Sequence, residues 1–194
     1  ATRPIADLEA YREKLNSFVY HSGFVMKPVF AAAKQAPRRV IYCEGEDERT
    51  LRAVQAVLDE GMAHPVLIGR PEVIERRIKS AGLRLQAGRD IEIVNPDHDP
   101  RYKELWQEYH RLLGRGGVTP SLAKLRMRAD TTLIGSMLLR RSDVDAMICG
   151  TQGQLSRHLQ HVNDVIGLRP NAHCFATMNM LLLPRHTLFM CDTY

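Results

Sequence analysis

Short apolar runs alternate with amphipathic stretches along most of the chain. The apolar runs lie at residues 39–43, 64–69, 90–94 and 144–149. They show no period of two, which predicts strands that are buried on both faces. The stretches between them carry apolar side chains at helical spacing, such as Leu51, Val54 and Leu58. Strands that alternate with helices of this length favour a parallel sheet.

The pattern predicts helices over residues 7–17, 24–36, 46–61, 71–81, 101–113, 130–140 and 156–166. One more helix opens at Thr119, a suitable N-cap, followed by Pro120 at the first helical position. Two further strand-like runs, 175–183 and 187–191, close the chain. We expect a three-layer α/β fold with a mainly parallel sheet and helices on both faces.

No helical stretch follows the last strand-like run to cover it. We therefore expect the chain to be a fragment that is cut inside a domain.

Composition indicates a soluble globular protein. The 194 residues are 44% hydrophobic and 25% charged, and no apolar run approaches the roughly 20 residues that span a bilayer. The start of the chain has no signal-peptide core, and the four cysteines form no CxxC pair. We expect a cytoplasmic protein with reduced, buried thiols and no membrane partner.

The net charge of +5 is mild and compatible with a phosphorylated small ligand. No motif of interleaved aromatic and basic residues accompanies it, so we expect no nucleic-acid partner.

The stretch CGTQGQLSRHLQHV, residues 149–162, is the strongest candidate for a site. It joins a predicted strand to a predicted helix, and Gly150 and Gly153 free the backbone of the turn. Thr151 adds a hydroxyl, so successive amides could face an anion. The spacing is neither GxGxxG nor the lysine-bearing P-loop, which argues against a dinucleotide. A plain turn remains the alternative.

Two other turns follow predicted strands. In CEGEDER, residues 43–49, acidic side chains would repel a phosphate, and Glu46 and Asp47 could simply offset the positive end of a helix. In LIGRP, residues 67–71, Arg70 could meet a phosphate, although a solvated arginine is the better interpretation.

The sequence gives little support for a metal site or for a catalytic nucleophile. His158 and His161 share a helical face, but a zinc site needs more ligands, so we expect no metal. Cys149, Cys174 and Ser156 lie in no known nucleophile pattern, and we assign no catalytic residue.

Several blocks resemble the phosphate acetyltransferase family, in order and over nearly the whole chain. They are RRVIYCEGEDERTLRAV, PVLIGRPEVI, RGGVTP, LIGSMLLRRSDVDAMICGT and ATMNMLLLPRHTLFMCDTY. FVYHSGFVMKPVFAAAK and MICGTQGQ resemble, more narrowly, the C-terminal phosphotransacetylase-like domain of bacterial hybrid NADP-dependent malic enzymes. That resemblance implies a phosphate acetyltransferase-like fold, with residues 1–37 as a helical lead-in joining an upstream catalytic part. It also implies a first α/β lobe over residues 38–149 and the start of a second lobe over residues 150–194, within which the chain is cut.

One departure from the family pattern concerns a phosphate-binding group. The family's arginine on the helix after the turn falls on Gln160, and its proline on His161. Glutamine donates hydrogen bonds but carries no charge to balance a phosphate. The candidate ligand-binding residues are Gly150, Thr151, Gln152, Gly153, Arg157 and Gln160.

The resemblance implies a regulatory domain that binds acetyl-CoA or a related CoA ligand and helps assemble a homo-oligomer. It implies no cofactor in this chain, with NADP and a divalent metal (Mg or Mn) in the malic enzyme's catalytic part, whose residues are absent here. The alternatives are an active phosphate acetyltransferase, which moves acetyl between CoA and phosphate, and an unrelated α/β protein.

Overall fold

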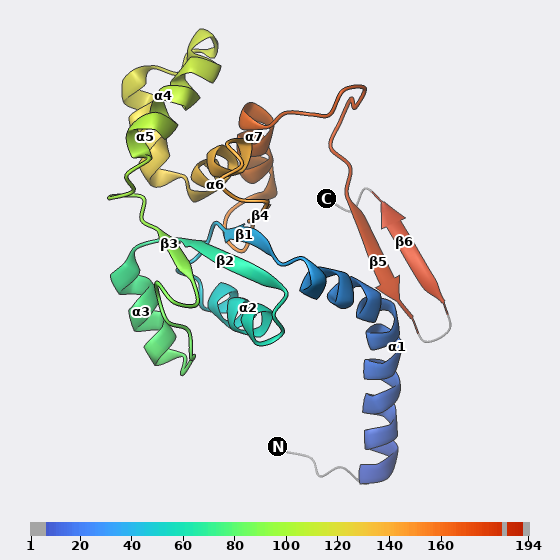
Figure 1. Cartoon of the computed structure of the whole chain (residues 1–194). Coiled ribbons are helices and arrows are strands. Elements are labelled where there is room, and N and C mark those ends of the chain that lie inside the picture. Colours follow the sequence, from blue (N-terminus) through green and yellow to red (C-terminus); the bar gives the residue numbers. More distant parts are fainter. Residues whose placement is uncertain (1–6, 184–185, 192–194) are drawn as a thin grey trace. The chain divides into compact units, whose positions relative to one another are not determined.

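The computed structural model describes residues 7–183 and 186–191 (Figure 1). The chain divides into two compact units. One is the continuous stretch Ala36–Leu168, and the other combines Ala1–Gln35 with Arg169–Tyr194.

The continuous unit is built on a four-stranded sheet in the order β3-β2-β1-β4. The strands are β1 (Arg38–Tyr42), β2 (Ala63–Ile68), β3 (Glu92–Val94) and β4 (Ala146–Ile148). All three pairings are parallel, and in the middle of the sheet Ile41 pairs with both Val66 and Met147. The predicted parallel sheet is confirmed.

Helices cover both faces of this sheet (Figure 1). On one face lie α2 (Glu48–Asp59) and α3 (Pro71–Ser80), packed on Tyr42 and Leu67. On the other face lie α4 (Tyr102–Leu113), α5 (Pro120–Ala129), α6 (Thr131–Arg140) and α7 (Leu155–Val165), with a short 3-10 turn at Gly114–Gly116. They pack on Ile41, Val66 and Ile68. Alternate side chains of each strand therefore enter different cores, which confirms the three-layer fold.

Local capping explains where two helices begin. The Thr119 hydroxyl accepts a hydrogen bond from the Leu122 amide, with Pro120 at the first helical position as predicted. Helix α2 begins two residues later than the sequence suggested, because the Asp47 side chain accepts from the Arg49 amide and serves as N-cap.

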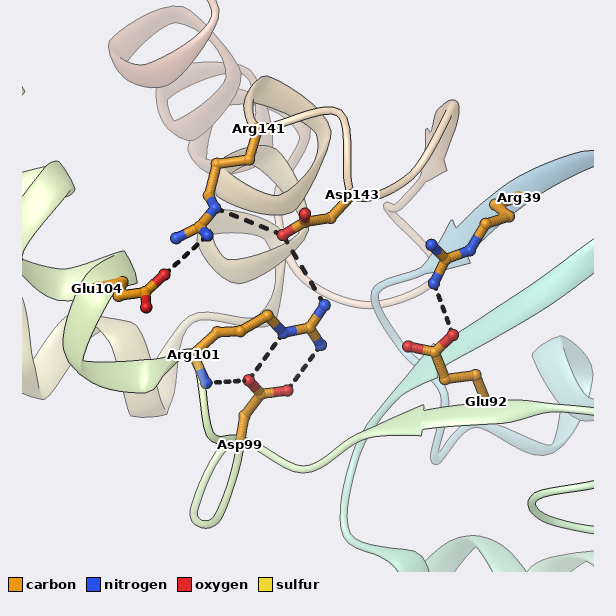
Figure 2. A network of polar contacts seen from close by, with 7 residues as sticks. All are labelled: Arg39, Glu92, Asp99, Arg101, Glu104, Arg141 and Asp143. Carbon is orange, nitrogen blue, oxygen red and sulfur yellow. Dashed lines mark hydrogen bonds and ion pairs between the residues drawn. The ribbon is translucent and has the colours of Figure 1, made fainter.

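A network of ion pairs fixes the connections that flank α4 and β4 (Figure 2). Arg101 binds Asp99 through its Nε and Nη2 atoms at 2.9 and 2.8 Å, and its Nη1 lies 3.8 Å from Asp143. Arg141 reaches the same Asp143 at 3.5 Å and binds Glu104 at 2.8 Å. The loop after β3 is thereby tied to the loop before β4.

The second unit differs from the sequence prediction in two ways. Helix α1 (Leu8–Gln35) is one helix, where two were expected. A glycine inside a helix costs only about 1 kcal/mol, so Gly23, between the two expected helices, does not end it. Pro28 lies inside the helix, as the sequence placed it. Strands β5 (Met178–Leu182) and β6 (Thr187–Cys191) form an antiparallel pair rather than joining the parallel sheet.

The four cysteines differ in how far they are exposed to solvent. Cys43 is buried as predicted and Cys149 is partly buried, but Cys174 and Cys191 are exposed, so the expectation of burial was wrong for these two. Among the described residues, no helix combines the length and apolarity needed to cross a membrane.

Candidate functional site

The carboxyl ends of the four parallel strands share one edge of the sheet. The chain leaves β1 for β2 on one side, while β4 pairs with β1 on the other, so the strand order reverses beside β1. Open parallel sheets bind ligands at such a reversal. The loop after β1 and the glycine-bearing loop after β4 meet there.

Two open cavities lie along this edge. One, of about 360 Å³, is lined by the loops after β1, β2 and β3 together with Arg128, Thr131 and Gln152. The other, of about 340 Å³, lies between the first turns of α6 and α7. Glu44, Thr131 and Gln152 line both.

The glycine loop is held by a carboxylate of the same chain. Gly150 and Gly153 have φ angles of 104° and 92°, in the region that favours glycine. The Gly150 amide donates to Oε1 of Glu44 at 2.9 Å, and the Thr151 hydroxyl donates to its Oε2 at 3.0 Å. The amide that the sequence suggested for an anionic ligand therefore already faces an anion.

A second carboxylate, Asp47, extends this contact. It accepts from the Arg49 side chain at 3.0 and 2.9 Å and from Nε2 of Gln152 at 2.8 Å. Hydrogen bonds from Arg49 and Gln152 hold the pKa of Asp47 well below its usual range, so it stays ionised. Arg49 also donates to the Thr151 carbonyl oxygen at 2.9 Å. The loops after β1 and β4 are thus tied together by several hydrogen bonds.

His158 fixes the other side of the glycine loop. Its Nε2 lies 2.7 Å from the Gln152 carbonyl oxygen, and its Nδ1 lies 2.7 Å from the Thr132 hydroxyl. Because a carbonyl only accepts, we assign the proton to Nε2, and Nδ1 then accepts from the hydroxyl. The sequence indicated His158 only as a poorly supported candidate metal ligand. In the structure its ring joins α7 to α6 and to the glycine loop.

Arg157 and His161 converge on Asp130 at the start of α6. Arg157 donates to Asp130 Oδ1 at 2.6 Å, so the carboxylate offsets the positive charge of the arginine. His161 is buried, with Nε2 3.8 Å from the same oxygen, and neither ring nitrogen has a hydrogen-bond partner among the described residues. Burial, the largest effect, lowers the pKa of His161 even though Asp130 acts to raise it. The ring is therefore neutral near pH 7.

The structure brings together most of the candidate residues. Gly150, Thr151 and Gln152 contact the acidic loop, and Gly153 and Arg157 line the second cavity. Gln160 is exposed on α7 and is absent from the residues that line either cavity. No cluster of metal-ligating side chains occurs within the part of the chain that the structure describes.

Sequence reasoning missed the roles of Glu44, Asp130 and His158. The acidic run after β1 was a usable signal for Glu44, but nothing in the sequence placed it opposite Gly150, 106 residues away.

Comparisons with known proteins agree with this architecture. A family model described as phosphate acetyl/butaryl transferase matches residues 24–194. Two solved phosphotransacetylases share the fold: that of Streptococcus pyogenes has a TM-score of 0.69 at 21% identity, and the EutD enzyme of Staphylococcus aureus 0.72 at 18%. The matches cover 80% and 84% of this chain and 47% and 49% of those chains.

Curated relatives are of two kinds. The chain is 51% identical over 195 residues to the NAD-dependent malic enzyme of Rhizobium meliloti, and 47% identical over 194 residues to the NADP-dependent malic enzyme of Escherichia coli. Both alignments cover the whole chain but only 25% and 26% of those proteins. The phosphate acetyltransferase of Haemophilus influenzae is 26% identical over 161 residues, which is 82% of this chain and 22% of that protein.

The chain therefore spans about a quarter of the length of the malic enzymes it matches. Since the family match runs through most of the chain and the parallel sheet has the phosphotransacetylase fold, the chain belongs to the phosphate acetyl/butaryl transferase family and is similar to the phosphotransacetylase-like part of malic enzymes.

Proposed function

We propose that this chain is a regulatory part of an NADP-dependent malic enzyme. It binds acetyl-CoA at the carboxyl edge of the sheet and lowers the rate at which the attached enzyme converts malate to pyruvate. The identities of 51% and 47% to malic enzymes, against 26% to a phosphate acetyltransferase, support this parentage. NADP and a Mg or Mn ion would belong to the remainder of that protein.

The observation that carries the regulatory role is the Glu44 carboxylate on the Gly150 amide and the Thr151 hydroxyl. Acetyl transfer to phosphate requires an anion held against the thioester with its charge balanced. A carboxylate in that place repels a phosphate and already occupies the Gly150 amide.

Two of the arginines that line the cavities are paired with acids as well. Arg157 binds Asp130, and Arg70 binds Glu46 with two hydrogen bonds of 2.9 Å. Gln160 supplies no charge. Loss of a positioned donor that meets developing charge commonly lowers a rate on the order of 10² to 10³-fold, so binding can persist where acetyl transfer does not.

An extended CoA ligand still finds polar and cationic groups here. Arg128 lines the first cavity and stacks on the Tyr102 ring, 4.7 Å from its centroid. The aromatic ring orients the guanidinium without neutralising its charge, which suits a phosphate of CoA.

The test uses the full-length protein that contains this chain. We expect added acetyl-CoA to lower malate-dependent NADPH formation, while CoA with acetyl phosphate yields no acetyl transfer. Arg128→Ala should raise the acetyl-CoA concentration needed for inhibition, and Arg76→Ala, which changes an exposed arginine of α3, should not.

Acetyl phosphate synthesis that is lost on changes between Thr151 and Gln160 would contradict the proposal. That result would favour the alternative, an active phosphate acetyltransferase.

We also propose a homo-oligomer. The β5–β6 pair exposes large apolar side chains, including Met178 at 62% and Phe189 at 60% of their surface. Exposed apolar surface of this kind marks association sites. Sedimentation should show an oligomer that dissociates on Phe189→Lys, and a monomeric unchanged protein would refute it.

A further inference from the structure

Two cysteines lie side by side directly beneath the glycine loop. Tyr42 and Ile148 are the last residue pair of the β1–β4 ladder, and Cys43 and Cys149 directly follow them on the two strands. The Cys43 amide donates to the Ile148 carbonyl oxygen at 3.0 Å, so the parallel pairing continues to this point. Adjacent strands lie about 4.8 Å apart, and disulfides join Cα atoms about 4.4 to 6.8 Å apart.

Both side chains enter the same core. Cys43 is fully buried among α4–α6 side chains, and Cys149 packs against that cluster while remaining partly exposed. Gly135 of α6 makes room for the Cys43 side chain, because a Cβ atom there would lie 2.7 Å from the Cys43 sulfur. The space around the Cys43 thiol therefore depends on a glycine.

The two thiols differ in how readily they ionise. A hydrogen bond from Cys43, the largest effect, lowers the pKa of Cys149 to about 7. Burial and the Glu44 carboxylate act in the opposite direction. The same contact with Cys149, together with burial, raises the pKa of Cys43. The thiolate therefore forms on the more accessible sulfur, as reactive cysteines require.

We propose that Cys149 and Cys43 form a peroxide-sensitive dithiol, with Cys149 as the attacking thiol and Cys43 as the resolving thiol. The Cys149 thiolate attacks one oxygen of hydrogen peroxide, the O–O bond breaks, and a sulfenic acid and hydroxide result. The hydroxide takes up the proton that the thiol released and becomes water. The Cys43 sulfur then attacks the Cys149 sulfur, the S–O bond breaks, and a second water leaves. Two thiols and one peroxide thus give one disulfide and two waters.

This inference is independent of the proposed function, and peptide mapping tests it on the unchanged protein. Trypsin places Cys43 in residues 40–49 and Cys149 in residues 142–157, while Cys174 and Cys191 fall outside both peptides. After a small molar excess of hydrogen peroxide, we expect these two peptides linked and two hydrogens lighter than their sum. A reductant should separate them.

Two variants separate the roles. Cys43→Ala should stop oxidation at a sulfenic acid on Cys149, which dimedone traps, and should move the pH profile of Cys149 alkylation to higher pH. The matched control is Cys174→Ser, which removes an exposed thiol and should leave the linked peptides unchanged.

The proposal fails if peroxide oxidises the exposed cysteines while Cys43 and Cys149 remain free thiols. It also fails if alkylation of Cys149 in the unchanged protein is half-maximal at or above the ordinary thiol pKa of about 8.5. Both outcomes are read on the unchanged protein, so a variant that does not fold would not affect the test.

Discussion

Two loops of the α/β unit share one local design. In Asp47-Glu48-Arg49 and in Asp99-Pro100-Arg101, the aspartate accepts from the amide of the arginine two residues later, at 2.8 Å in both. The arginine side chain then binds both carboxylate oxygens of the same aspartate. The first loop precedes α2 and the second precedes α4.

The two loops differ in what the arginine reaches next. The Arg101 side chain is 26% exposed and lies near Asp143 in the network of Figure 2, whereas that of Arg49 is 67% exposed and binds the carbonyl of Thr151. The loop with Asp99 and Arg101 therefore stabilises the scaffold, and the loop with Asp47 and Arg49 stabilises the candidate site. The same short motif thus acquires its role from a distant partner rather than from its own residues.

Removal of the Asp99 carboxylate should give the largest effect. The Asp99 side chain is 7% exposed. Its removal leaves the partly buried Arg101 guanidinium with the longer contact to Asp143, at 3.8 Å. Breaking a buried pair costs on the order of 3 kcal/mol, so we expect Asp99→Ala to lower the free energy of unfolding by about that amount in urea denaturation. Asp97→Ala, at a neighbouring exposed position, serves as control. Equal losses in both variants would remove the distinction between the two loops.

Acid should weaken both loops in the same direction. Burial acts to raise the pKa of Asp99, but hydrogen bonds from Arg101 outweigh it, and the pKa is lowered as it is for Asp47. A depressed carboxylate pKa stabilises the fold fully above the unfolded value, about 3.9, and this stabilisation is lost as pH falls below it.

Asp99→Asn and Asp47→Asn should therefore each flatten the fall of unfolding free energy below about pH 4, by at most about 1.4 kcal/mol per pH unit. A curve as steep as that of the unchanged protein would show that the carboxylate does not titrate with folding.

The capping role of Asp47 should give a smaller effect. Asp47→Ala removes the N-cap of α2, which typically costs about 1 kcal/mol. Asp47→Asn keeps a side-chain acceptor for the Arg49 amide, so we expect most of the stability to return in thermal or urea unfolding. If asparagine destabilises as much as alanine, the ion pair rather than the cap holds this loop.

Local features of the fold could be predicted from the sequence. The strands, the helices of the α/β unit and the Thr119 cap depend on neighbouring residues, and the parallel sheet follows from their alternation. The continuous α1 and the antiparallel pairing of β5 with β6 were not predicted, because Gly23, between the two expected helices, is only a weak stop signal and pairing direction depends on tertiary contacts.

The course of the glycine loop could be predicted from the sequence, but the charge beside it could not. The glycine loop and its two positive φ angles agree with the spacing of Gly150 and Gly153. The partners of that loop, Glu44 and Asp47, come from more than 100 residues away. Periodicity gives the order of elements along the chain, whereas the charge beside a loop depends on which strands become neighbours.

The smallest expected effect on overall stability concerns Glu44, which links the two sides of the site. Glu44→Gln keeps an oxygen for the Gly150 amide, but its amide nitrogen cannot accept from the Thr151 hydroxyl. We expect the free energy of unfolding to change by less than about 0.5 kcal/mol, because the contact lies at the surface and touches no core. Charge-assisted hydrogen bonds are about twice as strong as neutral ones, a difference of about 1 kcal/mol, so exchange of the Gly150 amide should quicken roughly fivefold.

Hydrogen exchange on the unchanged and variant proteins measures this local opening. The Cys43 amide, which donates to Ile148 within the ladder, is the internal reference and should keep its rate. Glu48→Gln is the matched variant, since Glu48 binds Arg52 on the exposed side of α2 and does not contact the glycine loop. An unchanged exchange rate of the Gly150 amide in Glu44→Gln would mean that the contact of Arg49 with the Thr151 carbonyl, rather than Glu44, holds the loop closed. The Glu44 carboxylate would then no longer support the proposed exclusion of phosphate.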